Sequence, residues 1–485
     1  MLEGSESIKY EAGMCYLRGL CYAKQNAFDR AKECYKDAVR IDVQCFEAFD
    51  QLMKNSLLSP GEQWDFLDSL DFDSMAPDPG DTAGSTQESA DFVRNLYMTR
   101  LSKYARPDES NTAIETLSSH YRLASNPDIL LSKAELLFTS SRFQPALDLT
   151  TSILDDDPYN FACIPLHLAL LHQTNSTNAL FALSHDLADT HPLEPCTWLA
   201  VGTYYLSTHR ISEARSYFSK ASLMDPHFGP AWIGFAHTFA AEGEGDQAIA
   251  AYATAARLFQ GTHLPQLFLG MQEISLGNLT IAREYLSRAY ELCDRDPLLI
   301  NEMGVVAYLE PRGEELPPDY DSACRHFELA LNIAEENGAS SQQYTSTRLN
   351  LAHALRQAGR FLESLEQFDE TIRLGLRDSQ VFASKGLVLL ELDQAFEATI
   401  ALHEALAISP QDPIASDLLG RALALLEGEG VLGGADEEAV DLGLQQKLAD
   451  VRKSRGGGRR RRVIRQVDEV GEGMDLDGAG DRRSP

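Results

Sequence analysis

The hydrophobic positions in the middle of the chain repeat with a period of 34 residues. The first copy consists of Trp198, Gly202, Tyr205, Ala214, Phe218 and Ala221, and the second of Trp232, Ala236, Phe239, Ala248, Tyr252 and Ala255. Small residues let two helices approach closely, and aromatic residues fill the space between them. Each period therefore predicts one pair of helices. Such a pair cannot bury its apolar face alone, so neighbouring pairs must stack.

The period and the residue order match the tetratricopeptide repeat (TPR). The fold class is therefore predicted as all-α, a TPR-type α-solenoid in which antiparallel helix pairs form a right-handed superhelix with a long concave groove. Weaker copies of the signature lie on both sides, for example Gly19, Tyr35 and Ala38 near the start and Gly386, Leu402 and Ala405 near the end. Proteins of this class usually hold other proteins, which favours a scaffold without a catalytic centre.

Interruptions of the pattern predict the domain organisation. N-terminal repeats are expected over residues 1–70, with a turn or helix start at Ser59-Pro60-Gly61. Residues 71–90 are rich in Pro, Gly, Ser and Asp and predict a flexible acidic insert. A degenerate helical pair is expected over 91–126. The main superhelix with the groove is expected over 127–427, and a low-complexity, mostly disordered tail with one short helix (435–453) over 428–485.

Net charge limits the kinds of partner. The formal charge of −31 argues against general nucleic-acid binding and against an anionic membrane surface. No window contains the roughly 18 consecutive apolar residues that span a bilayer, and Met1 to Tyr10 does not resemble a secretory signal. The eight cysteines are scattered without a CxxC pair. We therefore expect the nucleus or the cytoplasm as the location.

Each sequence pattern that could indicate catalysis or metal binding lacks the further residues that such a site requires. His403-Glu404 lacks a second histidine four residues later, so it is not a zincin site. The twelve histidines form no His/Cys group with metal-ligand spacing. Asp475-x-Asp477-Gly478 resembles the start of a calcium loop, but no glutamate follows at position twelve. We expect no enzyme activity, no cofactor and no metal.

Regulatory features are few. Ser59-Pro60 and Ser484-Pro485 are minimal proline-directed kinase sites, so Ser59 and Ser484 are candidate phosphosites. Ser409-Pro410 has the same form but occupies the turn that closes a repeat, where proline belongs to the signature. The basic run of residues 459–462 is interpreted either as a nuclear localisation signal or as a solvated charge cluster of the tail.

Residues outside the signature positions indicate a narrower family. The stretches YLRGLCY (16–22), CFEAFDQL (45–52) and NEMGVVAY (301–308), together with the whole of 217–265, resemble the TPR subunit of the anaphase-promoting complex called cell-division-cycle protein sixteen, or Cut-nine in fission yeast. The resemblance covers most of residues 10–425 and is most specific from 196 to 308. A generic TPR signature does not dictate LFQGTHLP or NEMGV.

The resemblance implies a non-catalytic scaffold in a multisubunit ubiquitin ligase that drives mitotic exit. In this family the groove of the later repeats holds the N-terminal segment of a small accessory subunit, and the outer surfaces contact other TPR subunits. The earlier repeats form a homodimer. Because family members usually carry further repeats ahead of the YLRG stretch, and this chain begins almost there, homodimerisation is the least supported of these expectations.

Repeat geometry selects the residues that line the groove. The first helix of each pair faces the concave side, with its fifth, ninth and twelfth positions pointing inwards. These positions form a stripe along each helix. Polar residues on the stripe can form hydrogen bonds with an extended peptide backbone, but they can equally bond to neighbouring helix ends or to water. The predicted lining consists of His237, Leu267, Met271, Ile274, Asn301, Val305, Tyr308, Leu349, His353 and Arg356, with Asn350 one position off the stripe.

Two other classes of protein stay open. An unrelated TPR adaptor, such as a co-chaperone that binds a carboxyl terminus, needs a Lys/Arg cluster on the concave helices, and the predicted stripe is mostly apolar and neutral. An enzyme with a TPR regulatory array needs a separate catalytic domain, which the low-complexity tail does not offer.

Overall fold

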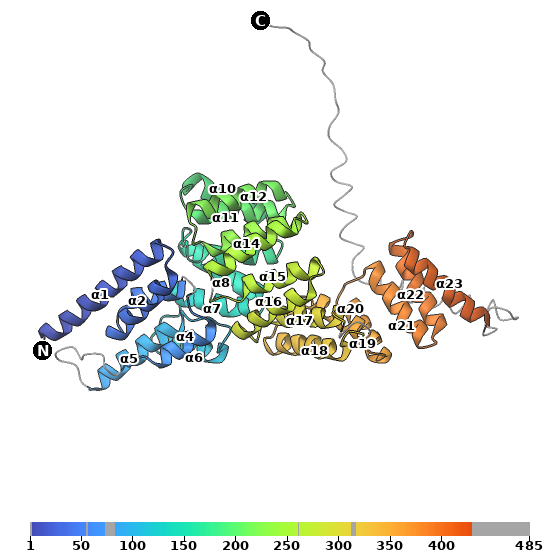
Figure 1. Cartoon of the computed structure of the whole chain (residues 1–485), viewed down its shortest axis with the longest axis horizontal. Coiled ribbons are helices and arrows are strands. Elements are labelled where there is room, and N and C mark those ends of the chain that lie inside the picture. The colour runs from blue at the N-terminus through green and yellow to red at the C-terminus, as the bar shows by residue number, and fades with distance from the viewer. Residues whose placement is uncertain (1, 55–56, 73–82, 260, 312–316, 429–485) are drawn as a thin grey trace, which may run out of the picture. The chain divides into compact units, whose positions relative to one another are not determined.

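The structure is a computed structural model, and it describes residues 2–54, 57–72, 83–259, 261–311 and 317–428. The chain forms two compact units, Met1–Gly375 and Leu376–Pro485. The described part consists of helices and loops (Figure 1), with a single isolated bridge between Pro311 and Pro318. The predicted all-helical TPR array is confirmed.

The helices follow one another as consecutive pairs, and the last one extends the second unit. The first unit contains α1 (Leu2–Lys24), α2 (Phe28–Ile41), α3 (Phe46–Lys54), α4 (Pro60–Asp68), α5 (Ala83–Met98), α6 (Pro107–Ser119), α7 (Pro127–Thr139), α8 (Phe143–Asp156), α9 (Ile164–Gln173), α10 (Thr177–Thr190), α11 (Pro195–Ser207), α12 (Ile211–Met224), α13 (Gly229–Ala241), α14 (Gly245–Leu258), α15 (Leu264–Ser275), α16 (Leu279–Leu292), α17 (Pro297–Leu309), α18 (Tyr320–Glu336), α19 (Thr345–Gln357) and α20 (Phe361–Arg373). The second unit contains α21 (Ser379–Glu391), α22 (Ala395–Ile408) and α23 (Pro413–Gly428).

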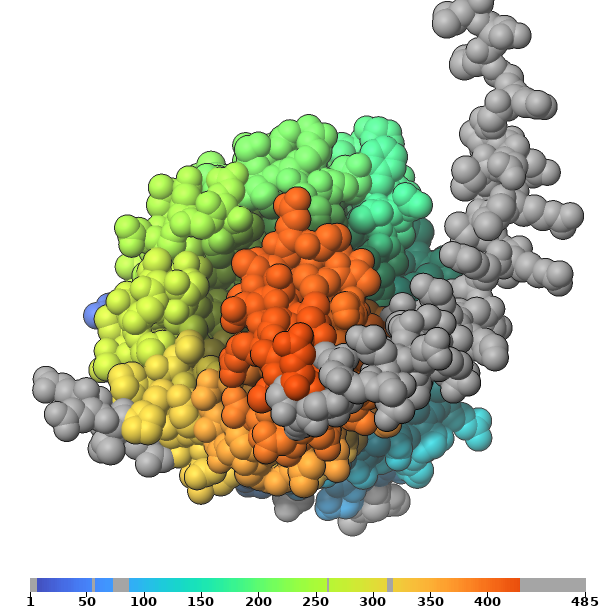
Figure 2. All heavy atoms as spheres, turned by 90° about the vertical axis from the view of Figure 1, so that its right-hand side faces the viewer, coloured from blue at the N-terminus to red at the C-terminus, as the bar shows by residue number. Residues whose placement is uncertain are grey.

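Close approach of the two helices in a pair explains the small residues of the signature. A Cβ atom added to Gly202 of α11 would lie 2.6 Å from Phe218 Cε1 of α12. The same relation holds between Gly304 and Phe327, at 2.7 Å. A larger side chain at either glycine would therefore displace a buried aromatic ring. Within the first unit, the pairs from α9 to α18 follow an arc from green to yellow (Figure 2).

The alanine of the second helix obeys the same constraint. Ala248 is fully buried and packs in one cluster with Ala236, Phe239 and Tyr252. Ala248→Leu is therefore expected to overpack this contact and to lower the free energy of unfolding by about 1–3 kcal/mol. Thermal unfolding measures the effect, with Ala253→Leu on the exposed side of the same helix as the control. Equal melting of both variants would contradict the repeat phase.

Two boundaries differ from the sequence prediction. The insert predicted for 71–90 is shorter, because α5 begins at Ala83 and Ala90 is already buried. Adding residues to an existing helix costs much less free energy than starting one. The polar residues 83–89 therefore extend α5 beyond its apolar part. The superhelix predicted as one body over 127–427 is divided at Gly375, which adopts a φ of +108° that glycine tolerates. Residues 73–82, and the short helix expected at 435–453, lie outside the described residues.

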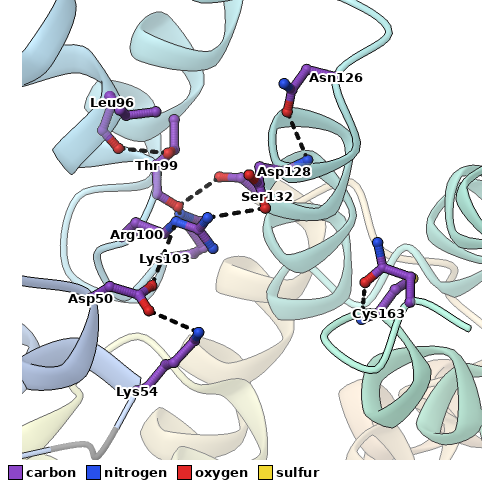
Figure 3. Close-up of polar contacts among 11 residues, drawn as sticks. Asp50, Lys54, Leu96, Thr99, Arg100, Lys103, Asn126, Asp128, Ser132 and Cys163 are labelled. Atoms are coloured by element: carbon purple, nitrogen blue, oxygen red, sulfur yellow. Dashed lines mark hydrogen bonds and ion pairs between the residues drawn. The ribbon is translucent and has the colours of Figure 1, made fainter. Parts of the chain in front are cut away.

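Polar contacts attach the degenerate pair to its neighbours (Figure 3). Arg100, just after α5, forms ion pairs with Asp128 of α7 at 3.0 Å and with Asp50 of α3 at 3.9 Å. The Ser132 hydroxyl donates to the carbonyl oxygen of Thr99 at 3.0 Å. These bonds replace the signature contacts that this pair lacks, and they fix the loop of residues 99–106 against α7.

Candidate peptide-binding groove

The polar centre of the predicted groove lies between α17 and α19. Asn350 Nδ2 donates to Asn301 Oδ1 at 3.2 Å, and Asn301 Nδ2 donates to Glu302 Oε1 at 2.9 Å. Asn301 is only 6% exposed. The structure therefore brings together two residues, 49 positions apart, that repeat geometry had selected separately. Their remaining amide groups suit hydrogen bonds to an extended backbone.

Glu302 is the groove residue that sequence reasoning missed. Burial raises the pKa of its carboxyl, and the hydrogen bond from Asn301 offsets part of this rise. The repeat stripe skips this position because Glu302 lies one residue beyond Asn301. In the sequence, Glu302 stands out only because it follows a polar residue of the predicted stripe. This position does not distinguish it from an acidic residue on an ordinary helix surface.

Two arginines lie on α19. Arg348 donates to Gln367 Oε1 of α20 at 2.9 Å and forms an ion pair with Glu335 of α18 at 3.8 Å, so its guanidinium already has partners on the neighbouring helices. The Nε atoms of Arg348 and Arg356 are buried, and neither has a hydrogen-bond partner within the described part of the chain. The polar groups that meet between α17 and α19 are therefore two amides and one carboxyl.

The two predicted histidines are already satisfied by their own helix pairs. His237 Nδ1 lies 2.5 Å from the Tyr252 hydroxyl, and its ring packs edge-on against Phe268. Burial lowers the pKa of His237 to about 4, so the ring is neutral near pH 7. The His353 ring packs edge-on against Phe368, and burial lowers its pKa as well. These contacts favour a structural role for both rings.

Apolar residues of the predicted stripe differ in their exposure. Leu267 is fully buried, so its assignment to the groove surface is wrong: this position packs in a core cluster with residues of α16 and α17. Met271 and Ile274 are partly buried beside the same cluster. Tyr308 is partly buried and packs against Tyr320, with ring centroids 5.6 Å apart. Val305 and Leu349 are also half-buried.

A pocket of about 300 Å³ lies where α7 and α9 meet the loop of residues 99–106. Lys103 Nζ donates to the carbonyl oxygens of Thr99 and Leu101, at 2.6 and 3.0 Å, and burial lowers its pKa to about 8. Burial also raises the pKa of Glu135 on α7. Other lining residues come from the loop before α15, namely Gly261, Thr262 and His263.

The candidate phosphosite Ser59 does not belong to the groove helices α15, α17 and α19. Ser59 is the N-cap of α4: its hydroxyl accepts from the backbone N–H of Glu62, and the Glu62 carboxylate accepts from the N–H of Ser59. The predicted helix start at Ser59-Pro60-Gly61 is thereby confirmed. Ser484, the basic run at 459–462 and the Asp475 motif lie outside the described residues.

The described residues contain no group of three or more His, Cys, Asp or Glu side chains placed to hold a metal ion. None of the helices over the same residues is long and apolar enough to cross a membrane.

Comparisons with known proteins define the class first. Residues 12–44 and 349–413 match models of the tetratricopeptide repeat, so the chain is a TPR protein. Over 86% of its length it is 48% identical to anaphase-promoting complex subunit cut9 of Schizosaccharomyces pombe, covering 60% of that protein. It is 32% identical to anaphase-promoting complex subunit 6 of Arabidopsis thaliana, covering 74% of that protein. The chain belongs to this family of anaphase-promoting complex subunits.

The match extends to a solved structure. A crystal structure of the APC/C hetero-tetramer Cut9-Hcn1 aligns with 85% of this chain and 76% of that one, with a TM-score of 0.73 and 48% identity. In length, however, the chain spans 60% of the fission yeast relative and 48% of CDC16 from Saccharomyces cerevisiae, which is 37% identical.

Proposed function

We propose that this chain is a non-catalytic TPR scaffold subunit of the anaphase-promoting complex/cyclosome, a multisubunit E3 ubiquitin ligase that controls mitotic progression and exit. The observation that carries the proposal is the 48% identity over 416 residues to a subunit of that complex. The aligned share of the chain, 86%, is too large to omit the groove helices, so the similarity is not limited to generic repeats.

The groove between α17 and α19 is the proposed binding site for the N-terminal segment of a small accessory subunit. Asn301 and Asn350 offer amide donors and acceptors to a peptide backbone. The crystal structure of the related Cut9 contains a second protein, Hcn1, which supports a partner of this kind.

The outer surfaces of the helix pairs are the proposed contacts with other TPR subunits of the complex. Homodimerisation stays a prediction, and so does a location in both nucleus and cytoplasm. The basic run at 459–462 supports the nuclear part of that prediction through its resemblance to a localisation signal.

Affinity purification of the tagged chain from dividing cells tests the proposal. Recovery of cullin-like and RING subunits, other TPR subunits and a very small protein is the expected result. Recovery of a chaperone in their place would contradict it and favour a co-chaperone adaptor.

Phosphorylation of Ser59 in mitotic cells is a further expected outcome. The site lies at the N-terminus of α4, where a phosphate is stabilised by free backbone N–H groups and the helix dipole. Lys32 forms an ion pair with Glu62 at 3.4 Å and so places a cation beside this helix start. Phosphopeptide mapping from mitotic and interphase cells checks both Ser59 and Ser484. Unmodified peptides for both serines would dismiss the idea.

A further inference from the structure

The first unit coils so that early and late repeats touch along a seam. Phe28 and His227 pack edge-on with ring centroids 5.4 Å apart. Tyr104 packs edge-on against His263 at 4.8 Å. Ser141 and Tyr344, which are 203 positions apart, share a hydrogen bond of 2.7 Å between their hydroxyl groups. In each case a turn or loop of the first eight helices meets the loop that precedes a much later helix.

Three seam residues begin the helices that carry the groove. His263 is the N-cap of α15, Asp296 of α17 and Tyr344 of α19. His263 Nε2 lies 2.8 Å from Asp296 Oδ2, and the other oxygen of Asp296 accepts from the N–H of Leu298. A displacement at the seam therefore moves the first turns of the helices that hold Met271, Asn301 and Asn350.

Part of the seam is buried, since His263 is 1% exposed. The Tyr104 ring packs against His263, and His263 bonds to Asp296, so these three side chains form one group. Burial raises the pKa of Tyr104. Ser141 and Tyr344 are half-buried. We name Tyr104, Ser141, His263, Asp296 and Tyr344 the seam cluster. Loss of the Ser141–Tyr344 hydrogen bond removes one contact that holds the early and late repeats together.

The Ser141 hydroxyl lies in the turn between α7 and α8, where Ser141 has a φ of +57°. Other repeats hold this turn position with glycine, at 243, 277 and 359, or with Asn26, Asn175, His209 and Asp393. The turn itself therefore does not require a serine. At Ser141 the hydroxyl forms the bond to Tyr344 across the seam.

We propose that the seam cluster is a clasp that sets how fast a peptide enters and leaves the groove. The proposal rests on the proposed function of the groove. An extended segment that lies along α15, α17 and α19 enters sideways only when their N-terminal ends separate from the early repeats. Breaking the Ser141–Tyr344 bond raises the population of the open state for the free and the occupied protein alike. Both rate constants rise, and the dissociation constant changes little.

Stopped-flow measurements with a fluorescent peptide of the N-terminal segment of fission yeast Hcn1 test the clasp. Tyr344→Phe removes only the hydroxyl, and Ser141→Gly removes the partner hydroxyl while easing the turn. Each variant is expected to raise the association and dissociation rate constants about three- to tenfold, the range of one typical intramolecular hydrogen bond. The double variant should equal the single ones, because the same bond is lost once.

His209→Gly is the matched control, since His209 holds the same kind of turn with a φ of +58° and is exposed. Hydrogen exchange of α19 in the free protein gives a second readout, with faster exchange expected in both seam variants and not in the control. Unchanged rates and unchanged exchange would overturn the clasp. Failure of the wild-type chain to bind the peptide would instead overturn the proposed groove, and the exchange result would still decide whether the seam opens.

Discussion

Phe218→Ala is expected to lower the free energy of unfolding by about 3–5 kcal/mol, as for other fully buried phenylalanines. The ring is 1% exposed and is held by two different helix pairs. A Cβ at Gly202 of its own pair, or at Gly234 of the next pair, would lie 2.6 or 2.8 Å from it. Truncation therefore leaves a cavity in the contact that couples two repeats, and neighbouring pairs lose part of their interface as well.

Urea denaturation followed by far-UV circular dichroism measures this loss. Phe181→Ala is the matched control, because Phe181 is 52% exposed and packs only beside Tyr204 and His185. We expect the control to cost less than about 1 kcal/mol. If the two alanine variants unfolded at the same urea concentration, Phe218 would not be the residue that joins the pairs.

Asn350→Ala is expected to weaken binding of the Hcn1 peptide about tenfold, which corresponds to about 1.4 kcal/mol. The substitution removes an amide that meets the groove and also frees Asn301 from its bond at 3.2 Å. The free energy of unfolding should change by less than about 1 kcal/mol, because the lost bond is long, at 3.2 Å, and Asn350 is only half-buried. Fluorescence anisotropy gives the dissociation constant, and thermal unfolding gives the stability.

Asn111→Ala provides the comparison, since Asn111 is exposed on α6 and bonds only to Glu115 one turn away. Undiminished binding by Asn350→Ala would remove α19 from the groove. The result also separates the groove from the seam cluster: a groove residue changes the dissociation constant, whereas a clasp residue changes both rate constants together.

Sequence periodicity was informative about the repeats because each pair is a local structure. Gly202 and Phe218 lie 16 residues apart, and their contact follows from the packing of two adjacent helices. Periodicity predicted the groove less well. It selected Leu267, which is fully buried, because the repeat pattern does not reveal how closely α16 and α17 pack over this position. It also omitted Glu302, since a strict stripe has no place for the residue beside it.

By itself the sequence determined the class of fold, the positions of most helices and the family, because helix pairing depends on residues within one 34-residue period. Only the tertiary structure decided which side chains meet across the array. Asn301 and Asn350 form a hydrogen bond, the first unit ends at Gly375, and Ser141 reaches Tyr344 203 positions away. These features depend on the sum of small rotations between successive pairs, and no single period of the sequence encodes that sum.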